Sequence, residues 1–351
     1  SKKVFSTLVN IVLLSIKYKI MRLAIIGATG LVGRQILEVI VERDFFFTEL
    51  ILVASNKSIG EEINLKNKTY FICSTSEMLE KKPHLALLSA GSETSKELAP
   101  KLNLIGCKVI DNSSFWRMNE RYKLIIPEIN GHELSSEDMI ISNPNCSTIQ
   151  LLVVLAPIHK KYNIQRAVVS TYQSVSGSGK KAINQLENEE IGKEGEMAYP
   201  YQIYRNAIPH IDSFEENGYT GEEMKIINET HKILDSNIQI TATAVRIPVE
   251  AGHSESVNLL LSNEFEIAKI KNEISNIDGV TLRDDAKKNI YPMPVFAKGL
   301  DDVFVGRIRR DFSQSNSLNM WIVADNLRKG AATNTLQIAE YLIENNLLKI
   351  K

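Results

Sequence analysis

Leu23-Ala-Ile-Ile26 runs directly into Gly27-Ala-Thr-Gly30-Leu-Val-Gly33, and residues 35–42 follow with apolar side chains at helical spacing. A short continuous apolar run predicts a strand that is buried on both faces. A strand, a glycine loop and a helix in this order suit a dinucleotide, because glycine lets the backbone approach the pyrophosphate and the helix start offers N–H groups. The spacing is GxxGxxG and not the strict GxGxxG, so a plain tight turn remains the alternative.

The alternation of strands and helices continues after this turn. Further apolar runs are separated by stretches with helical periodicity, such as residues 92–102. Strands that alternate with helices form a parallel sheet covered on both faces, which predicts an α/β, doubly wound domain of the Rossmann type. The predicted strands after the first are residues 50–54, 85–89 and 108–111.

Beyond residue 146 the pattern changes. Residues 148–155 predict a helix with Pro157 near its end, and residues 330–348 predict a C-terminal helix. The strand-like runs between them have fewer intervening helices, which favours an α+β domain with a mixed or antiparallel sheet. These runs are Ala167–Tyr172, Ile238–Val245, Ser256–Leu261 and Asn319–Ala324. We therefore predict a first domain over 21–145, completed by the C-terminal helix within 326–351, and a second domain over 146–325.

The first twenty residues differ from the rest. Lys2 and Lys3 precede an apolar run, Val4–Ile16, and Met21 opens the first predicted strand. The run is too short to span a membrane comfortably, and no cleavage site of the A-x-A type follows it. We interpret residues 1–20 as an N-terminal extension, with a signal-like targeting segment as the alternative.

Composition excludes several classes of protein. The formal net charge is −1 over 351 residues, so a general polyanion-binding surface is not indicated and we expect neither nucleic acid nor membrane as partner. The three cysteines, Cys73, Cys107 and Cys146, lie far apart without a CxxC pair. This spacing suits neither a metal site nor a disulfide framework, and it favours a reducing, cytoplasmic location.

The residues after the second predicted strand bear on the choice of coenzyme. An NAD enzyme usually carries an acidic residue there to hold the ribose 2′-OH. Here the strand leads into Ser55-Asn-Lys57-Ser58, and no carboxylate occurs before Glu61. Hydroxyls and a cation suit a 2′-phosphate, which favours NADP(H). An ordinary solvated loop would have a similar composition.

Ser142-Asn-Pro-Asn-Cys146-Ser-Thr148 places a cysteine at the predicted start of a helix. Helix N–H groups stabilise a thiolate and make the sulfur reactive. The polar neighbours and Pro144 distinguish Cys146 from Cys73 and Cys107, which we interpret as structural.

The run SNPNCST resembles the active-site signature of the aspartate-semialdehyde dehydrogenase family, and the resemblance extends from Met21 to the C-terminal helix. Pro-Asn before the cysteine argues against the related N-acetyl-glutamyl-phosphate reductases, which tend to carry glycine there. The other stretches that carry the resemblance, in the family's order, are GATGLVG, DNSSFWRM, YQSVSGSG, EEMKIINET, RIPVEAGHS, GRIRRD and NLRKGAATN.

The resemblance implies roles for individual residues. Cys146 would be the acyl-thioester nucleophile, Gln173 would orient the substrate, and His253 would be the acid/base, a role that suits imidazole near neutral pH. The substrate would be bound by Arg117 and Lys225 at the phosphate, Glu222 at the α-ammonium, Arg246 at the α-carboxylate and Asn145 at the oxyanion. The implied cofactor-binding residues are Gly27, Thr29, Gly30, Leu31, Val32, Ser55, Lys57, Ser58, Ser176, Gly177 and Asn326.

Alternatives to these roles also follow from the residues. Glu222 and Lys225 have the spacing of an ordinary exposed ion pair on a helix, and such a pair contributes little to the stability of a protein. The other histidines have no recognisable surroundings, and we interpret them as surface or core residues; they are His84, His132, His159, His210 and His231.

The activity that the resemblance implies is the NADPH-dependent reductive dephosphorylation of L-aspartyl 4-phosphate to L-aspartate 4-semialdehyde through a cysteine thioester. Its context would be lysine (via diaminopimelate), threonine and methionine biosynthesis, by a homodimer whose interface comes mostly from the second domain's sheet. The alternatives are a reductase for another acyl phosphate or thioester, such as N-acetyl-glutamyl phosphate, a cysteine hydrolase that uses Cys146 and His253, and a non-catalytic NADP-binding regulator.

Overall fold

A computed structural model describes residues 21–349, so the predicted extension at 1–20 lies outside the described residues. The chain divides into two compact units. Within the described residues, unit 1 comprises 21–123, Gly131–Asn143 and 335–349, and unit 2 comprises Leu124–Asn130 and Pro144–Asn334. Within residues 21–349, none of the helices combines the length and the apolar character that crossing a membrane requires.

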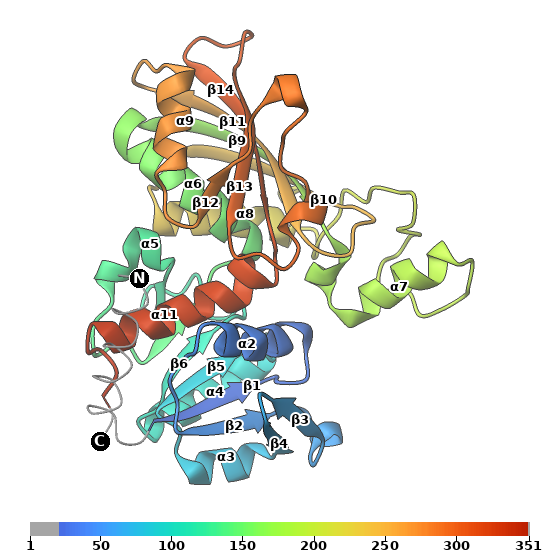
Figure 1. Cartoon of the computed structure of the whole chain (residues 1–351), viewed down its shortest axis with the longest axis vertical. Helices are drawn as coiled ribbons and strands as arrows, with labels where there is room; N and C mark the ends of the chain where they lie inside the picture. Colours follow the sequence, from blue (N-terminus) through green and yellow to red (C-terminus); the bar gives the residue numbers. More distant parts are fainter. Residues whose placement is uncertain (1–20, 350–351) are drawn as a thin grey trace. The chain divides into compact units, whose positions relative to one another are not determined.

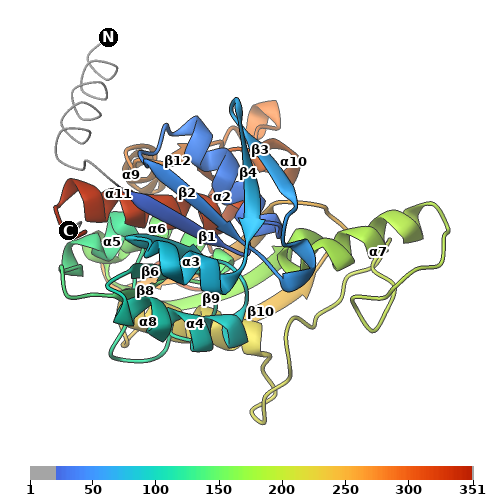
Figure 2. The ribbon, with the colours of Figure 1, turned by 90° about the horizontal axis from the view of Figure 1, so that it is seen from below.

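Unit 1 is built on an eight-stranded sheet with the order β3-β4-β2-β1-β5-β6-β8-β7 (Figures 1 and 2). β1 lies between β2 and β5, and both pairs are parallel, as are β2–β4, β5–β6 and β6–β8. The predicted doubly wound parallel sheet is therefore confirmed, with an antiparallel edge strand, β3, added to it. The strands are β1 (Arg22–Ile26), β2 (Glu49–Val53), β3 (Glu62–Leu65), β4 (Lys68–Cys73), β5 (Leu85–Leu88), β6 (Lys108–Asp111), β7 (Lys123–Leu124) and β8 (Ile140–Ser142).

The helices of unit 1 pack on this sheet through a buried apolar core. The C-terminal helix α11 lies beside α2, and an ion pair of 2.6 Å joins Arg43, at the end of α2, to Glu340 of α11 (Figure 1). The helices are α2 (Leu31–Glu42), α3 (Thr75–Lys81), α4 (Ser92–Leu104) and α11 (Thr333–Glu344).

Unit 2 contains a six-stranded mixed sheet with the order β10-β9-β11-β14-β13-β12. β9 and β10 are parallel, whereas β11 is antiparallel to both β9 and β14, which confirms the predicted mixed sheet. Three helices, α6, α8 and α9, bury their apolar residues in one core cluster with the strands. The strands are β9 (Ile164–Gln173), β10 (Gln239–Arg246), β11 (His253–Leu261), β12 (Val280–Leu282), β13 (Val303–Arg310) and β14 (Ser317–Ala324). The helices are α5 (Pro127–Asn130), α6 (Cys146–Tyr162), α7 (Lys180–Glu190), α8 (Gly221–Ile233), α9 (Ile267–Ser275) and α10 (Pro294–Ala297).

Several elements differ from the prediction. Pro157 lies inside α6 and not near its end, because the helix continues to Tyr162. Proline costs one backbone hydrogen bond, but Ile158 and Tyr162 are buried in the core and hold the last turns in place. The predicted C-terminal helix is shorter, since Arg328–Ala332 form a π-helical turn before α11. β3, β4, β12 and β13 are not among the predicted strands.

Two short segments lie outside the predicted domain boundaries. Leu124–Asn130 belongs to unit 2 because Leu124 and Ile126 are part of its apolar core. The segment before Thr335 also belongs to unit 2, where Lys329 forms an ion pair of 2.6 Å with Glu128.

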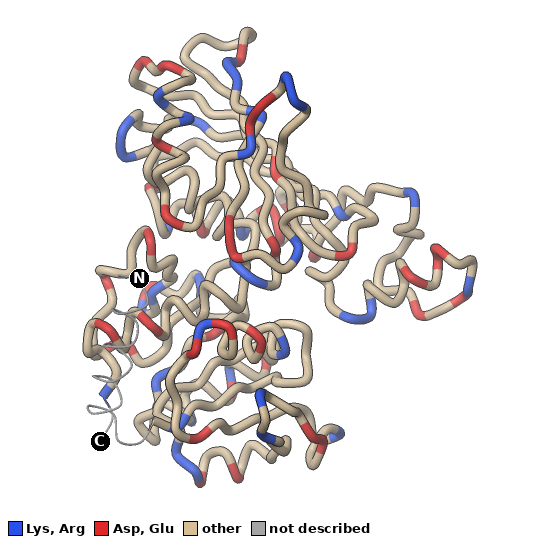
Figure 3. The backbone as a smooth tube through the Cα atoms, in the orientation of Figure 1, with Lys and Arg blue, Asp and Glu red and all other residues tan. Residues whose placement is uncertain are grey.

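Charged residues are distributed evenly over each unit. Figure 3 shows Lys and Arg interspersed with Asp and Glu along both units, without a long stretch of one sign. This distribution agrees with the net charge of −1.

Candidate active site

Cys146 is the first residue of α6. Asn145 caps the helix, because its side-chain oxygen accepts hydrogen bonds from the N–H groups of Ser147 (2.9 Å) and Thr148 (3.3 Å). Cys146 is half-buried, whereas its neighbours from Ile141 to Gln150 are buried. The thiol therefore lies at a helix start, where the positive end of the helix dipole favours a thiolate. By contrast, burial raises the pKa of the Cys73 and Cys107 thiols, as expected for structural cysteines.

Two side-chain amides and a carboxylate surround this helix start within unit 2. Nδ2 of Asn145 donates to Oε1 of Glu222 (2.9 Å), and Nε2 of Gln173 donates to the same oxygen (3.1 Å). Nε2 of Gln173 also reaches the hydroxyl of Ser147 at 3.1 Å. Gln173 is at the end of β9 and Glu222 is in the first turn of α8, so residues far apart in the sequence meet at one place.

Glu222 is a buried carboxylate that is ionised. Burial alone would raise its pKa, but the charge of Lys225, the hydrogen bonds from Asn145 and Gln173 and the charge of Arg246 together lower the pKa. Lys225 lies three residues further along α8 and contacts Glu222 at 3.3 Å and Asp212 at 2.7 Å. The predicted ion pair is present, but its carboxylate is 5% exposed and so is not an ordinary surface group.

The adjacent Glu223 has a different task. Its Oε2 accepts from the N–H of Thr220 (2.8 Å) and its Oε1 from the N–H of Ala244 (2.9 Å), so it caps α8 and ties the helix to β10. Glu222, and not Glu223, is therefore the carboxylate that lies beside Asn145 and Gln173.

His253 is completely buried at the start of β11. The N–H of Ser174 donates to Nδ1 at 3.1 Å, which fixes the neutral ring in the tautomer with its proton on Nε2. Among residues 21–349, Nε2 has no hydrogen-bond partner. Burial, followed by the charge of Arg246, lowers the pKa of His253 well below its usual range, although a backbone hydrogen bond at Gly252 acts in the opposite direction. The ring is thus neutral, with one N–H available.

Arg246 ends β10 and is 2% exposed. Its Nη1 donates to the carbonyl of Ser174 (2.6 Å), and its guanidinium lies 5.9 Å from the ring centre of Tyr199. Within the described part of the chain, no carboxylate lies within ion-pairing distance of Arg246, and its Nε has no acceptor. A buried guanidinium with no carboxylate in direct contact favours binding of an anion.

Ser174, Ser176 and Asn326 form a hydrogen-bond network that holds the loop after β9. Oδ1 of Asn326 accepts from Ser174 Oγ (3.0 Å), from Ser176 Oγ (3.2 Å) and from the N–H of Gly252 (3.0 Å). A side chain at Gly177 would meet Arg246 Nη1 at 2.9 Å and the His253 ring at 3.2 Å, so it would displace one of these two side chains. The side chains of Ser176 and Asn326 are thus bonded to the protein itself, and their predicted role toward the nicotinamide remains a prediction.

In unit 1, the glycine loop lies at the carboxyl end of β1. Gly27 has φ of 89°, and a side chain there would meet the carbonyl oxygen of Ser89 at 2.6 Å. A side chain at Gly33 would lie 2.1 Å from the carbonyl oxygen of Gly27, so both glycines are required by packing. Gly30 is exposed and caps α2 without a side-chain hydrogen bond. The first turn of α2, with Leu31 and Val32 after Thr29, is therefore open to a phosphate.

The other predicted nucleotide and phosphate residues also lie in unit 1. Ser55 and Lys57 are exposed and Ser58 is half-exposed in the turn after β2, the strand next to β1. Arg117 is buried, and its Nη2 donates to the carbonyl of Asn112 at 2.8 Å. Its predicted pairing with Lys225, which is in unit 2, remains a prediction.

Known proteins resemble this chain along nearly its whole length. The NAD binding domain of the semialdehyde dehydrogenases matches residues 22–137, and the dimerisation domain of these enzymes matches residues 155–329. The aspartate-semialdehyde dehydrogenase of Aquifex aeolicus is 49% identical over 337 residues, which cover 93% of this chain and 99% of the relative. The chain belongs to the aspartate-semialdehyde dehydrogenase family.

Other members of the aspartate-semialdehyde dehydrogenase family support the same assignment. The enzyme of Bacillus subtilis is 44% identical, over 93% of this chain and 99% of the relative. The crystal structure of aspartate semialdehyde dehydrogenase II from Vibrio cholerae, complexed with ASA, is 42% identical and has a TM-score of 0.89. It covers 93% of this chain and 99% of that chain, so the predicted family and the fold are confirmed.

Gly330 and Glu229 are not among the predicted site residues of this family member. A side chain at Gly330 would lie 2.7 Å from Cβ of Cys146, so glycine allows the π-helical turn to pack against the nucleophile. Glu229 accepts the N–H of Asn145 at 2.7 Å and fixes the residue before Cys146. The sequence does hint at Gly330, because a glycine within the otherwise helical run NLRKGAATN indicates a close backbone contact. Nothing in the sequence around Glu229 indicates its role.

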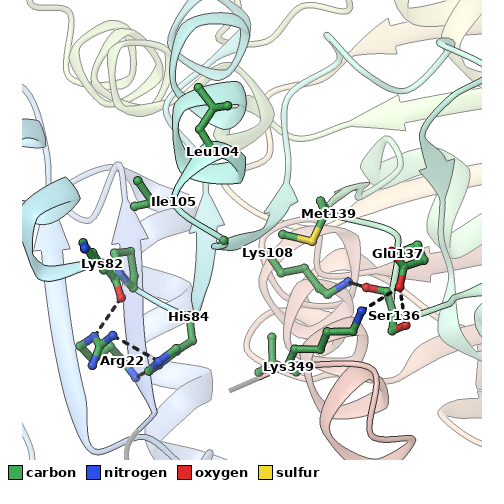
Figure 4. A pocket seen from close by; sticks show the side chains of 13 residues that line it. Arg22, Lys82, His84, Leu104, Ile105, Lys108, Ser136, Glu137, Met139 and Lys349 are labelled. Atoms are coloured by element: carbon green, nitrogen blue, oxygen red, sulfur yellow. Dashed lines mark hydrogen bonds and ion pairs between the residues drawn. The ribbon is translucent and has the colours of Figure 1, made fainter. Parts of the chain in front are cut away.

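A cavity of about 500 Å³ lies elsewhere in unit 1 and is shown in Figure 4. It adjoins the amino-terminal ends of β1, β5 and β6, where Arg22, His84 and Lys108 are found. Nζ of Lys108 donates to the carbonyls of Ser136 and Asp138. Dinucleotides bind at the carboxyl ends of the strands in such sheets, so this cavity is not the coenzyme site of the aspartate-semialdehyde dehydrogenase fold.

Proposed function

We propose that the chain catalyses the reaction L-aspartyl 4-phosphate + NADPH + H⁺ → L-aspartate 4-semialdehyde + phosphate + NADP⁺, in amino-acid biosynthesis. Cys146 is the nucleophile, His253 the acid/base, and Gln173 the group that orients the acyl carbon. Membership of the aspartate-semialdehyde dehydrogenase family supports this reaction.

One observation carries the choice of substrate: Arg246 is a buried guanidinium that has no carboxylate partner among the described residues, and Glu222 is a buried carboxylate in the same cluster. A free amino acid offers an α-carboxylate for the first and an α-ammonium for the second. An N-acetylated amino acid lacks the ammonium and would leave Glu222 facing an amide. The pair therefore favours aspartyl phosphate over N-acetyl-glutamyl phosphate.

The proposed mechanism assigns a task to each residue of the chain. The start of α6 stabilises the Cys146 thiolate, which attacks the acyl phosphate and expels phosphate, and Lys225 and Arg117 are the cations assigned to that phosphate. Nδ1 of His253 accepts from the Ser174 N–H, so the N–H on Nε2 is the one that can donate a hydrogen bond to the substrate oxygen on which negative charge develops. We assign Asn145 to the oxyanion, a role for which its side-chain amide at the start of α6 is suited once substrate replaces Glu222 as the acceptor of Nδ2.

The coenzyme supplies the hydride when it is bound. Gly30 and the open first turn of α2 suit the pyrophosphate, and Ser55, Lys57 and Ser58 suit the 2′-phosphate of NADP(H). We also propose a homodimer, supported by the match of residues 155–329 to the family's dimerisation domain. A reducing, cytoplasmic location fits a reaction that needs Cys146 as a thiol.

A comparison of substrates tests the proposal. The full chain is assayed with aspartyl phosphate, N-acetyl-glutamyl phosphate and malonyl-CoA, each with NADPH and with NADH. Aspartyl phosphate with NADPH is expected to give the highest kcat/KM. Glu222→Gln should lower kcat/KM more for aspartyl phosphate than for the N-acetylated substrate, because only aspartyl phosphate has an ammonium group to lose its carboxylate partner. Preference for either other acyl donor, or turnover without a nicotinamide coenzyme, would contradict the proposal.

A further inference from the structure

Glu255 is a buried acid that the mechanism above does not use. It lies in β11, two residues after His253, and is 0% exposed. Alternate residues of a strand share a face, so its side chain points the same way as His253 and Val257, into the core that α6 covers. Its cross-strand neighbours are Thr171 in β9 and Ile322 in β14.

Among the described residues, Gln150 is the one polar side chain that interacts with the Glu255 carboxyl group, and a hydrogen bond from its amide would favour the ionised acid. With the amide as it stands, neither carboxyl oxygen has a hydrogen-bond partner across residues 21–349. Nε2 of Gln150 donates instead to the carbonyl of His253 (3.4 Å), and Oε1 of Gln150 is also buried without a donor. Two interacting side chains thus have three buried oxygen atoms without a donor among the described residues, which is costly for acceptors.

Turning the Gln150 amide over does not remove the conflict. Nε2 could then serve an ionised Glu255, but Oε1 would face the carbonyl oxygen of His253, which is another acceptor. A proton on Glu255 satisfies all three groups with the amide as it stands: the carboxyl O–H donates to Oε1, and Nε2 donates to His253.

We propose that Glu255 is a positioning residue that works as a neutral carboxylic acid: its O–H holds the Gln150 amide, which in turn holds the backbone of His253. The proposal rests on the acid/base role of His253 and deepens it. Gln150 lies one helical turn after Cys146 in α6, so the same contact joins the strand of the acid/base to the helix of the nucleophile.

The charges around Glu255 agree with a neutral acid. His253 on its own strand is held neutral, and Gln173 and Thr171 on β9 and Ile322 on β14 carry no charge. On α6 the side chain that interacts with it, Gln150, is neutral. The cations of the π-helical turn are paired with other carboxylates, Arg328 with Asp301 (2.8 Å) and Lys329 with Glu128 (2.6 Å). Burial raises the pKa of Glu255 well above its usual range.

This protonation state has a consequence for stability with a definite sign. The folded-state pKa of Glu255 is raised, so its contribution is fully present below the unfolded-state pKa and is lost as the pH rises toward the folded-state pKa. Glu255→Gln keeps the shape and a donor but binds no proton. We therefore expect the variant to gain stability relative to the wild type as the pH rises from about 5 to about 8.

Glu223→Gln is the matched control, because Glu223 is buried in the same unit but accepts two N–H groups at 2.8 and 2.9 Å. Glu223→Gln removes a hydrogen-bond acceptor, so the Tm of this variant should fall at every pH in that range. Glu255→Gln should not lower Tm in the same range. Infrared difference spectroscopy of the full chain gives a second readout: the band of a protonated carboxyl group should vanish in Glu255→Gln and persist in Glu223→Gln.

Measurements of kcat distinguish a positioning role of Glu255 from a role in which the side chain only fills space. Glu255→Leu fills the site without a donor and should lower kcat about tenfold at unchanged KM, and Glu255→Gln should restore kcat with the wild-type pH profile. A lower Tm in Glu255→Gln, a displaced pH profile or the absence of the infrared band would overturn the proposal. The Tm and infrared readouts do not depend on substrate, so they decide the matter even if the proposed reaction fails its own test.

Discussion

The polar side chains around Cys146 in unit 2 bond to one another, whereas the nucleotide edge of unit 1 presents backbone and exposed side chains. Glu222 accepts from both Asn145 and Gln173, and Asn326 accepts from three donors. In unit 1, Gly30 begins α2 without a side-chain cap, and Lys57 is exposed. The catalytic cluster is therefore assembled before substrate arrives, while the nucleotide edge gains its partners from the coenzyme.

This difference predicts how the two regions respond to substitution. In a cluster of hydrogen-bonded side chains, one substitution leaves a buried group without its partner, and the loss of activity is large. At an exposed edge, water replaces the lost contact, and the loss of binding affinity is small. Substitutions in the cluster around Cys146 should thus reduce catalysis strongly with little effect on coenzyme affinity, and substitutions at the nucleotide edge should do the reverse.

Cys146→Ser should have the largest effect. Serine fits the first turn of α6 but lacks a thiolate, so kcat should fall at least about a thousandfold while the Kd for NADPH is unchanged. Steady-state kinetics and coenzyme fluorescence titration measure the two quantities. Cys73→Ser is the control and should keep full activity. Activity retained in Cys146→Ser would remove this residue from the mechanism.

Arg246→Lys should have the next largest effect. Lysine keeps the charge but cannot present the planar pair of donors to a carboxylate, and it leaves the Ser174 carbonyl without its 2.6 Å donor. We expect kcat/KM for aspartyl phosphate to fall about a hundredfold, the equivalent of about 2.7 kcal/mol. The Kd for NADPH should not change. An unchanged KM for substrate would mean that Arg246 does not bind the α-carboxylate.

The contrast between the two regions also marks what sequence can predict. The glycine loop and the buried strands can be predicted because their contacts are short-range. Gly33 packs against the backbone of Gly27, and Gly27 packs against Ser89 at the end of the neighbouring strand. Cys146 is recognisable because the helix start adjoins it in the chain. The predicted strand that begins at Ser256 is too short, because polar residues such as Glu255 do not fit the pattern of a buried strand. In the structure β11 begins at His253, and only cross-strand pairing reveals it.

The pH dependence of stability should show the neutral state of His253. Its folded-state pKa is lowered, so protonation is easier in the unfolded chain and stability is lost as the pH falls below about 6.5. The slope of the unfolding free energy should be at most about 1.4 kcal/mol per pH unit. His253→Gln should flatten this slope in denaturant titrations below about pH 6.5, and His132→Gln, an exposed control, should not. Equal slopes in wild type and His253→Gln would show that the ring is not buried in its neutral form.

Lys57→Met should have the smallest effect, because Lys57 is exposed and an exposed ion pair contributes little. We expect the Kd for NADPH to rise about fivefold, the equivalent of about 1 kcal/mol, with kcat unchanged. The Kd for NADH should not change, since NADH has no 2′-phosphate. Lys101→Met, an exposed lysine of α4, is the matched control for loss of one positive charge from unit 1. Equal weakening of NADPH and NADH would mean that Lys57 acts through the general charge of the surface, and the preference for NADP(H) would then have to come from Ser55 and Ser58.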